Sequence, residues 1–317
     1  MKSLIFQMRT VIVMVIGLAW MGMATHGATI TWTNTFGGDW NTALNWSPNQ
    51  VPTATDIAVI SNDNVTVSLS ASASAGGIVL GSGGQYPSTL SLNGQTLTLA
   101  GPLTVTSSGR FTVDSGTLVG GASGVTLSGA VGWSAGSLAG SLTVAADGVL
   151  TIGTGNNHDF NAIIFTNNGT VTWNLGTLRS GNGASICNNG LWDCRSDDQL
   201  NAAYAGTVTF NNYGTFRKSG GASEFLSSTL IASSVAFNQL GGFIDVQNGT
   251  NGLQLAFQGG GNFTAGYITT NQYGLTVLSQ GNFNLNGTVT GTNTWEDCGN
   301  LVGNNMIQGA LTWVCGN

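Results

Sequence analysis

The sequence predicts an all-β protein: a right-handed parallel β-helix, or β-solenoid, that is covered at its amino-terminal end by a cap. The first observation is a phrase of nine or ten residues that recurs with the same glycine frame at 109–118, 169–178 and 242–250, with shorter relatives at 214–220 and 281–289. In each copy apolar and polar residues alternate, and a Gly-Thr pair closes the longer copies, which is typical of one short strand running into one tight turn. The second observation is that glycine interrupts the chain throughout and no stretch after residue 28 keeps an apolar period of 3.6 residues, so long helices are excluded.

Turn signals in the second half of the chain give the length of one coil. Four of them follow one another at intervals of 21, 24 and 28 residues: Asn168-Gly169, Asn189-Gly190, Tyr213-Gly214 and Gly241-Gly242. This spacing is close to one coil of a parallel β-helix, and at ~22 residues per coil the chain would hold about a dozen coils. The apolar positions of the recurring phrase should then face the core, namely Phe111, Val113, Val171, Trp173, Ile244 and Val246.

An array of β-sandwich domains is the competing fold. Such an array would show turn signals every ~8 to 12 residues and linkers between its domains. The chain instead shows a coil-length period, contains only four prolines and has no visible linker. Disorder is disfavoured because apolar β-branched and aromatic residues alternate with Thr and Ser almost throughout.

Three segments follow one another along the chain. Residues 1–28 combine Lys2 and Arg9, an apolar stretch at 11–20 and small residues near their end, which predicts a secretory signal peptide. The apolar stretch is shorter than the ~20 residues that a membrane-spanning helix needs, so such a helix is disfavoured. Residues 29–64 are expected to form an aromatic, unrepeated cap. Residues 65–317 are expected to form the solenoid, which stops inside a repeat and so looks truncated at its carboxyl end.

The composition excludes some classes of partner. Charged residues make up 6% of the chain, and removal of the signal would leave five basic against thirteen acidic residues, a net charge of −8. A nucleic-acid-binding surface needs clustered Lys and Arg, and Arg217-Lys218 is the only adjacent basic pair. We therefore expect no nucleic-acid partner. After residue 28 no stretch is apolar enough to span a membrane.

The segment 193–198 holds the candidates for catalysis. Asp193, Asp197 and Asp198 lie close together in the sequence, and clustered carboxylates can act as acid and base or bind Ca²⁺. The competing interpretation, which we favour, is a solvated loop, so a non-enzymatic protein is expected over an enzyme. His158-Asp159 could form a general-base pair, but a turn position explains it more simply. No Cys-x-x-Cys occurs and His158 is the one histidine after the signal, so we expect no metal and no cofactor.

Three tryptophans of the cap are the candidate ligand-binding residues. Trp32, Trp40 and Trp46 could stack on sugar rings. Terminal units of solenoids cover the open end of the apolar core, and strand alternation points these tryptophans inward. We favour packing and keep carbohydrate binding as the alternative.

The chain has four cysteines, and an even number in an exported protein indicates disulfides. Their close spacings suggest that Cys187 pairs with Cys194 and that Cys298 pairs with Cys315. Free, buried thiols are the alternative.

The glycine-framed repeats, together with the segment 36–40 and Asn45-Trp46, resemble the bacterial β-strand-repeat surface and secreted proteins, a group related in pattern to autotransporter passengers and filamentous-haemagglutinin-like adhesins. The resemblance covers most of the chain after the signal. It implies a right-handed parallel β-helix, export, and a role in surface structure or attachment. We therefore expect a secreted or cell-surface protein without enzymatic activity, whose partners are surface glycans or matrix polysaccharide. The alternative is a β-helix carbohydrate-active enzyme or a carbohydrate-binding protein.

Overall fold

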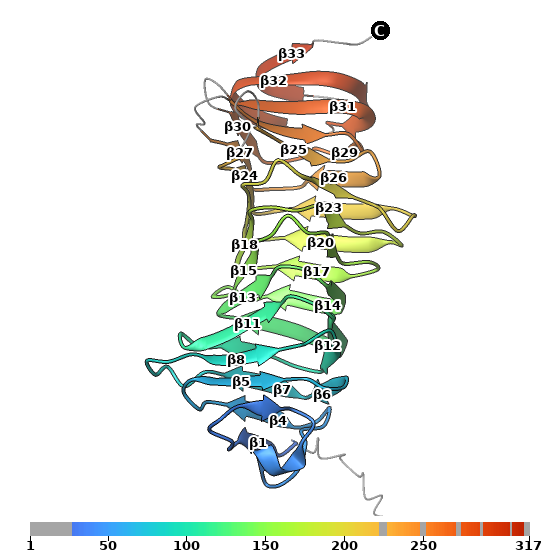
Figure 1. The fold of residues 1–317 in the computed structure, drawn as a ribbon. Helices are drawn as coiled ribbons and strands as arrows, with labels where there is room; N and C mark the ends of the chain where they lie inside the picture. Colours follow the sequence, from blue (N-terminus) through green and yellow to red (C-terminus); the bar gives the residue numbers. More distant parts are fainter. Residues whose placement is uncertain are drawn as a thin grey trace, which may run out of the picture.

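The computed structural model describes residues 27–221, 227–247, 252–270, 274–285, 288–304 and 306–313. Over these residues the chain forms a β-solenoid of about ten turns, with its strands stacked along one long axis (Figure 1). The predicted fold class is confirmed. Coil length varies around the expected ~22 residues: stacked amide side chains in the second half are 21, 24 and 27 residues apart.

The turns build three parallel sheets, which we call sheets A, B and C. Sheet A contains β1 (Thr29–Trp32), β4 (Ile57–Ile60), β7 (Gly77–Leu80), β10 (Leu103–Val105), β17 (Ile164–Asn167), β20 (Ala184–Asn188), β23 (Val208–Asn212), β26 (Val235–Gln239) and β29 (Gly261–Asn262). Sheet B contains β2 (Gly38–Asp39), β5 (Val65–Ser68), β8 (Ser88–Ser91), β11 (Gly109–Val113), β13 (Ala130–Trp133), β15 (Val149–Ile152), β18 (Thr170–Trp173), β21 (Leu191–Cys194), β24 (Thr215–Lys218), β27 (Phe243–Val246) and β30 (Tyr267–Thr270).

Sheet C contains β6 (Ala73–Ala75), β9 (Thr96–Leu99), β16 (His158–Asp159), β19 (Leu178–Arg179), β22 (Gln199–Asn201), β25 (Ser227–Ile231) and β28 (Leu253–Phe257). Five long strands bend at a corner and join two or more sheets: β12 (Thr117–Ser128), β14 (Ser137–Val144), β31 (Leu275–Asn284), β32 (Thr288–Val302) and β33 (Met306–Trp313).

The recurring phrase of the sequence is the strand of sheet B. Its three longer copies form β11, β18 and β27, and a shorter relative forms β24. The other shorter relative, 281–289, is an exception: it begins in β31, where Phe283 pairs with Gly261 of β29 in sheet A. The inward positions stack in two columns, because parallel strands in one register place every second side chain on the same face. The six residues that were predicted to face the core are all buried, with at most 2% of their surface exposed: Phe111, Val113, Val171, Trp173, Ile244 and Val246.

A column of glycines explains why the phrase begins with glycine. At the corner between sheets A and B, a Cβ atom on Gly190 would lie 2.1 Å from the carbonyl oxygen of Gly169, and one on Gly214 would lie 2.2 Å from the oxygen of Gly190. Any larger residue would separate the turns. These turn signals therefore mark places where successive backbones come too close for a side chain.

The first turn covers the end of the core. β1 pairs in parallel with β4 and antiparallel with β3 (Trp46–Ser47), which follows the short 3₁₀ helix η1 (Ala43–Asn45). Residues 1–26, which include most of the expected signal peptide, lie outside the described residues. Among the residues that are described, no helix is long and apolar enough to cross a membrane.

Candidate functional site

The three candidate sugar-stacking tryptophans lie inside the cap. Trp32, Trp40 and Trp46 expose 1%, 0% and 0% of their surface. The ring centroids of Trp32 and Trp46 are 4.9 Å apart, and those of Trp40 and Trp46 are 4.8 Å apart, both edge to face. The Trp46 indole nitrogen also donates to the Trp40 carbonyl oxygen at 2.7 Å. These rings pack against one another, as in the favoured interpretation, and leave no exposed face for stacking on a sugar.

Asp193 lies on the outer side of sheet B, in β21, and is only 3% exposed. Arg195 donates from Nε to Asp193 Oδ2 at 2.8 Å, and Ser219 donates its hydroxyl to Oδ1 at 2.5 Å. Ser219 belongs to the next turn, so this carboxylate ties two turns together. The contacts that hold Asp193 are structural ones.

Asp197 and Asp198 lie after β21, at the corner toward sheet C. Asp197 accepts a hydrogen bond from the Lys218 ammonium at 3.0 Å, and Lys218 is fully buried and also donates to the Ser196 carbonyl oxygen at 2.7 Å. Asp198 accepts the backbone N–H of Gly176, one turn earlier, at 2.6 Å. Both aspartates line a shallow hollow of about 260 Å³.

Asp193, Asp197 and Asp198 therefore each contact different partners, and the three carboxylates do not converge on one place where a substrate would react. Among the described residues, no group of three His, Cys, Asp or Glu side chains is arranged to hold a metal ion. Lys218 was missed as a partner because a lysine after an arginine suggests a solvated pair. The alternation of β24 nevertheless places it on the same inward face as Phe216.

His158 and Asp159 point to opposite sides of β16. His158 is fully buried against Trp133, with ring centroids 5.0 Å apart, and burial lowers its pKa. Burial alone would raise the pKa of Asp159. The two hydrogen bonds from Arg179, at 2.7 and 2.8 Å, together with Tyr204 and the charge of Arg179, outweigh it, and the pKa lies below its usual value. The two side chains do not form a general-base pair.

The first pair of cysteines is free in the structure. Cys187 is half-buried on the outer side of β20, whereas Cys194 is fully buried on the inner side of β21. The expected Cys187–Cys194 disulfide is therefore corrected: strand alternation sends the two thiols to opposite sides of the wall. The expected pair Cys298 and Cys315 lies outside the residues whose side chains are described.

A buried ladder of amides was not foreseen from the sequence. Asn167 donates from Nδ2 to Asn188 Oδ1 at 2.7 Å, Asn188 donates in the same way to Asn212 at 2.7 Å, and Asn212 donates to Gln239 Oε1 at 2.8 Å. All four side chains are fully buried at the corner between sheets A and B. Each of these amide residues comes two positions before a turn glycine, as Asn188 does before Gly190. The sequence therefore predicts exposed turn residues at these positions.

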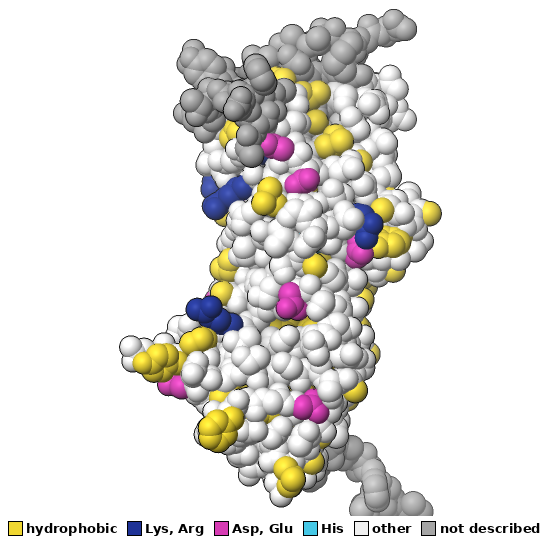
Figure 2. Space-filling view, viewed as in Figure 1, with side chains coloured by type: hydrophobic (Ala, Val, Ile, Leu, Met, Phe, Trp, Pro, Cys, Tyr) yellow, Lys and Arg dark blue, Asp and Glu magenta, His cyan; other side chains and the backbone are white. Residues whose placement is uncertain are grey.

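The outer face of sheet B is a regular surface. Its side chains form two straight columns, because the strands keep one register over six turns. One column runs through Ala130, Val149, Thr170, Leu191, Thr215 and Phe243, and the other through Gly132, Thr151, Thr172, Asp193, Arg217 and Asp245. Figure 2 shows isolated charged side chains on the visible face rather than a patch of one sign.

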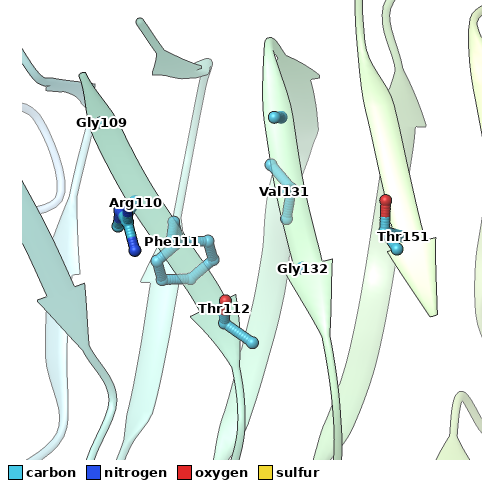
Figure 3. A pocket seen from close by; sticks show the side chains of 8 residues that line it. Gly109, Arg110, Phe111, Thr112, Val131, Gly132 and Thr151 are labelled. Atoms are coloured by element: carbon cyan, nitrogen blue, oxygen red, sulfur yellow. The ribbon is translucent and has the colours of Figure 1, made fainter. Parts of the chain in front are cut away.

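Two shallow hollows of about 320 Å³ each interrupt this outer face. The first lies where Gly132 has no side chain between Thr112 and Thr151, with Arg110 at its edge (Figure 3). The second, which we call the Phe243 hollow, is lined by Thr215, Arg217, Phe243 and Asp245.

Comparison with protein-family models, with curated proteins and with solved structures finds no match to this chain.

Proposed function

We propose that this protein is an exported β-solenoid without enzymatic activity, which serves as a structural or attachment component at the cell surface or in the surrounding matrix. The observation that carries the proposal is the architecture itself. About ten turns of stacked parallel sheets offer long, sparsely charged walls, and the function of repeat proteins of this kind lies in such extended surfaces.

The proposal includes the finer resemblance to bacterial β-strand-repeat proteins of the autotransporter and haemagglutinin type, with surface glycans or matrix polysaccharide as partners. It also includes secretion after removal of the signal peptide. The amino-terminal sequence and the low proportion of charged residues, 6%, support both.

Localisation tests this proposal directly. An antibody against the solenoid should label intact cells or detect the protein in the medium, and the amino-terminus of that protein should start after the signal. Cells in which the full-length chain stays in the cytoplasm would overturn the proposal.

The alternative is a carbohydrate-active enzyme that uses Asp193, Asp197 and Asp198, and the hollow beside Asp197 and Asp198 is the observation in its favour. A polysaccharide-degradation screen separates the two. We expect no release of reducing ends. Turnover by the wild-type protein that is lost in a folded Asp197→Asn variant and kept in Asn189→Ala would establish the enzyme instead.

A further inference from the structure

We propose that the Phe243 hollow on the outer face of sheet B is a binding subsite for a neutral saccharide. The inference rests on the proposed surface role, and it names the residues and the class of ligand. Among the described side chains, the hollow is lined from two adjacent strands, with Thr215 of β24 beside Phe243 of β27 and Arg217 beside Asp245.

An exposed aromatic ring is the first requirement of a sugar subsite. Phe243 keeps 49% of its surface exposed, although it stands in a strand whose neighbouring inward positions are fully buried. An aromatic face of this kind packs against the apolar C–H face of a pyranose ring and fixes its orientation. The cap tryptophans lack this property because they are buried.

Polar groups beside the ring supply the second requirement. Arg217 donates from Nε to Asp245 Oδ2 at 2.8 Å, and the two side chains are 32% and 19% exposed. Within the described residues, the terminal nitrogens of Arg217 and the Oδ1 atom of Asp245 have no further hydrogen-bond partner. The pair therefore presents donors and an acceptor beside the ring, and the Thr215 hydroxyl adds one group of each kind.

The spacing of these groups suits one sugar ring. Residues two apart on a strand are about 6.6 Å apart, and neighbouring strands are about 4.8 Å apart. The described side chains Thr215, Arg217, Phe243 and Asp245 outline an area of about the footprint of one pyranose. From β24 the face continues over Leu191 and Asp193 of β21 and over Thr170 and Thr172 of β18. It reaches the first hollow at Thr151 of β15, three strand spacings from β24, or about 14 Å. A glycan chain could follow this path along the solenoid axis.

The charge of the hollow selects among saccharides. Arg217 and Asp245 neutralise each other, and the chain as a whole has a formal net charge of −6. A polyanionic glycan would be repelled by the chain and would have to compete with Asp245 for Arg217. The chemistry therefore favours a neutral hexose over an acidic or sulfated sugar.

Calorimetric titration of the purified protein tests this site. The probes are cellohexaose, mannohexaose and maltohexaose as neutral chains and hexagalacturonate as an acidic chain. At least one neutral probe should bind, and Phe243→Ser should weaken it by about tenfold. Phe36→Ser is the matched control, because Phe36 is 97% exposed but lies in the cap; it should bind as the wild type does.

A second variant tests the same hollow without replacing Phe243, so its result does not depend on whether Phe243→Ser folds correctly. Asp245→Asn preserves the shape of the hollow but removes its acceptor charge and releases Arg217, so neutral binding should fall and hexagalacturonate binding should rise. The inference is overturned if no neutral probe binds the wild type, if Phe243→Ser binds as well as Phe36→Ser, or if the wild type prefers hexagalacturonate. Loss of cell attachment in Phe243→Ser without sugar binding by the wild type would assign the hollow to a protein partner and would also overturn it. Phe243→Ser should still be exported, so these results stand apart from the localisation that tests the proposed function.

Discussion

Truncation of Asn188 to alanine should remove a central rung of the buried amide ladder. The Asn188 side chain donates to Asn212 Oδ1 at 2.7 Å and to the Thr215 carbonyl oxygen at 3.1 Å, and it accepts from Asn167 Nδ2 at 2.7 Å. The variant leaves three groups without these partners: the buried Asn212 oxygen, one buried N–H of Asn167 and the partly buried Thr215 carbonyl oxygen. A buried polar group that loses its partner costs about 1–3 kcal/mol, so the two buried amide groups together predict a loss of about 4 kcal/mol.

The neighbouring residue provides a matched control. Asn189 is exposed, and its amide donates to Asn168 Oδ1 at 2.9 Å on the surface. Because water replaces such a partner readily, Asn189→Ala should cost at most about 0.5 kcal/mol. Equal losses in the two variants would refute the argument that burial of the ladder, rather than the presence of asparagine, provides its stability.

Equilibrium unfolding in urea, followed by circular dichroism, measures both losses. Solenoids can unfold in parts, so hydrogen exchange of the β20 and β23 amides should accompany it and show the loss locally. A loss below about 1 kcal/mol for Asn188→Ala, with unchanged exchange, contradicts the magnitude derived from unsatisfied groups.

An aspartate at the same position adds a pH test. In Asn188→Asp the carboxylate would place an acceptor against the acceptor Oδ1 of Asn212, so the loss at neutral pH should exceed that of alanine. Burial raises the pKa of such a carboxyl, and a folded-state pKa above the unfolded one means that stability is regained as pH falls through it. A loss that does not diminish on acidification would contradict this geometry.

Three further predictions concern buried side chains. Asp197→Asn should cost about 3 kcal/mol because it leaves the buried Lys218 ammonium without a counter-charge, whereas Lys218→Met should cost less than about 1 kcal/mol; urea unfolding with the reverse order would refute the asymmetry. The pKa of His158 is lowered by burial, so stability should be lost as pH falls below 6.5, its ordinary value, toward the folded-state pKa, and His158→Phe should abolish that dependence in thermal unfolding. Iodoacetamide should label Cys187 but not Cys194 in the folded, unreduced protein, because Cys194 is fully buried and burial raises its pKa strongly; a peptide linked through both residues in mass spectrometry would show instead that they form a bridge.

The parts of the fold that depend on period and glycine were predictable. The recurring phrase identified sheet B, since alternation assigned Phe111 and Val171 to the core without knowledge of the neighbouring turns. The turn at Gly190 was predictable because its turn signal recurs at the spacing of one coil. The structure adds the physical reason for glycine there, which is the close approach of the Gly169 carbonyl group.

Side chains whose role depends on the neighbouring turn were not predictable in the same way. Asn188 has the chemistry of a turn residue, and only the stacking of Asn167 and Asn212 on either side makes it a core residue. Phe243 shows the same limit. Its place in the phrase was known, but its exposure beside Arg217 is set by the register of two strands.

The amide ladder also determines where this protein can change in length. Successive rungs are separated by 21, 24 and then 27 residues, yet the amide contacts remain at 2.7, 2.7 and 2.8 Å. In the 24-residue coil, residues 202–207 connect sheet C to sheet A, whereas the shorter segment 180–183 makes the same connection in the preceding, 21-residue coil. The corner between sheets A and B thus fixes the pitch, while connections elsewhere accept insertions. A foreign peptide placed between β22 and β23 would be displayed from the side of the molecule without altering the stacking of its walls.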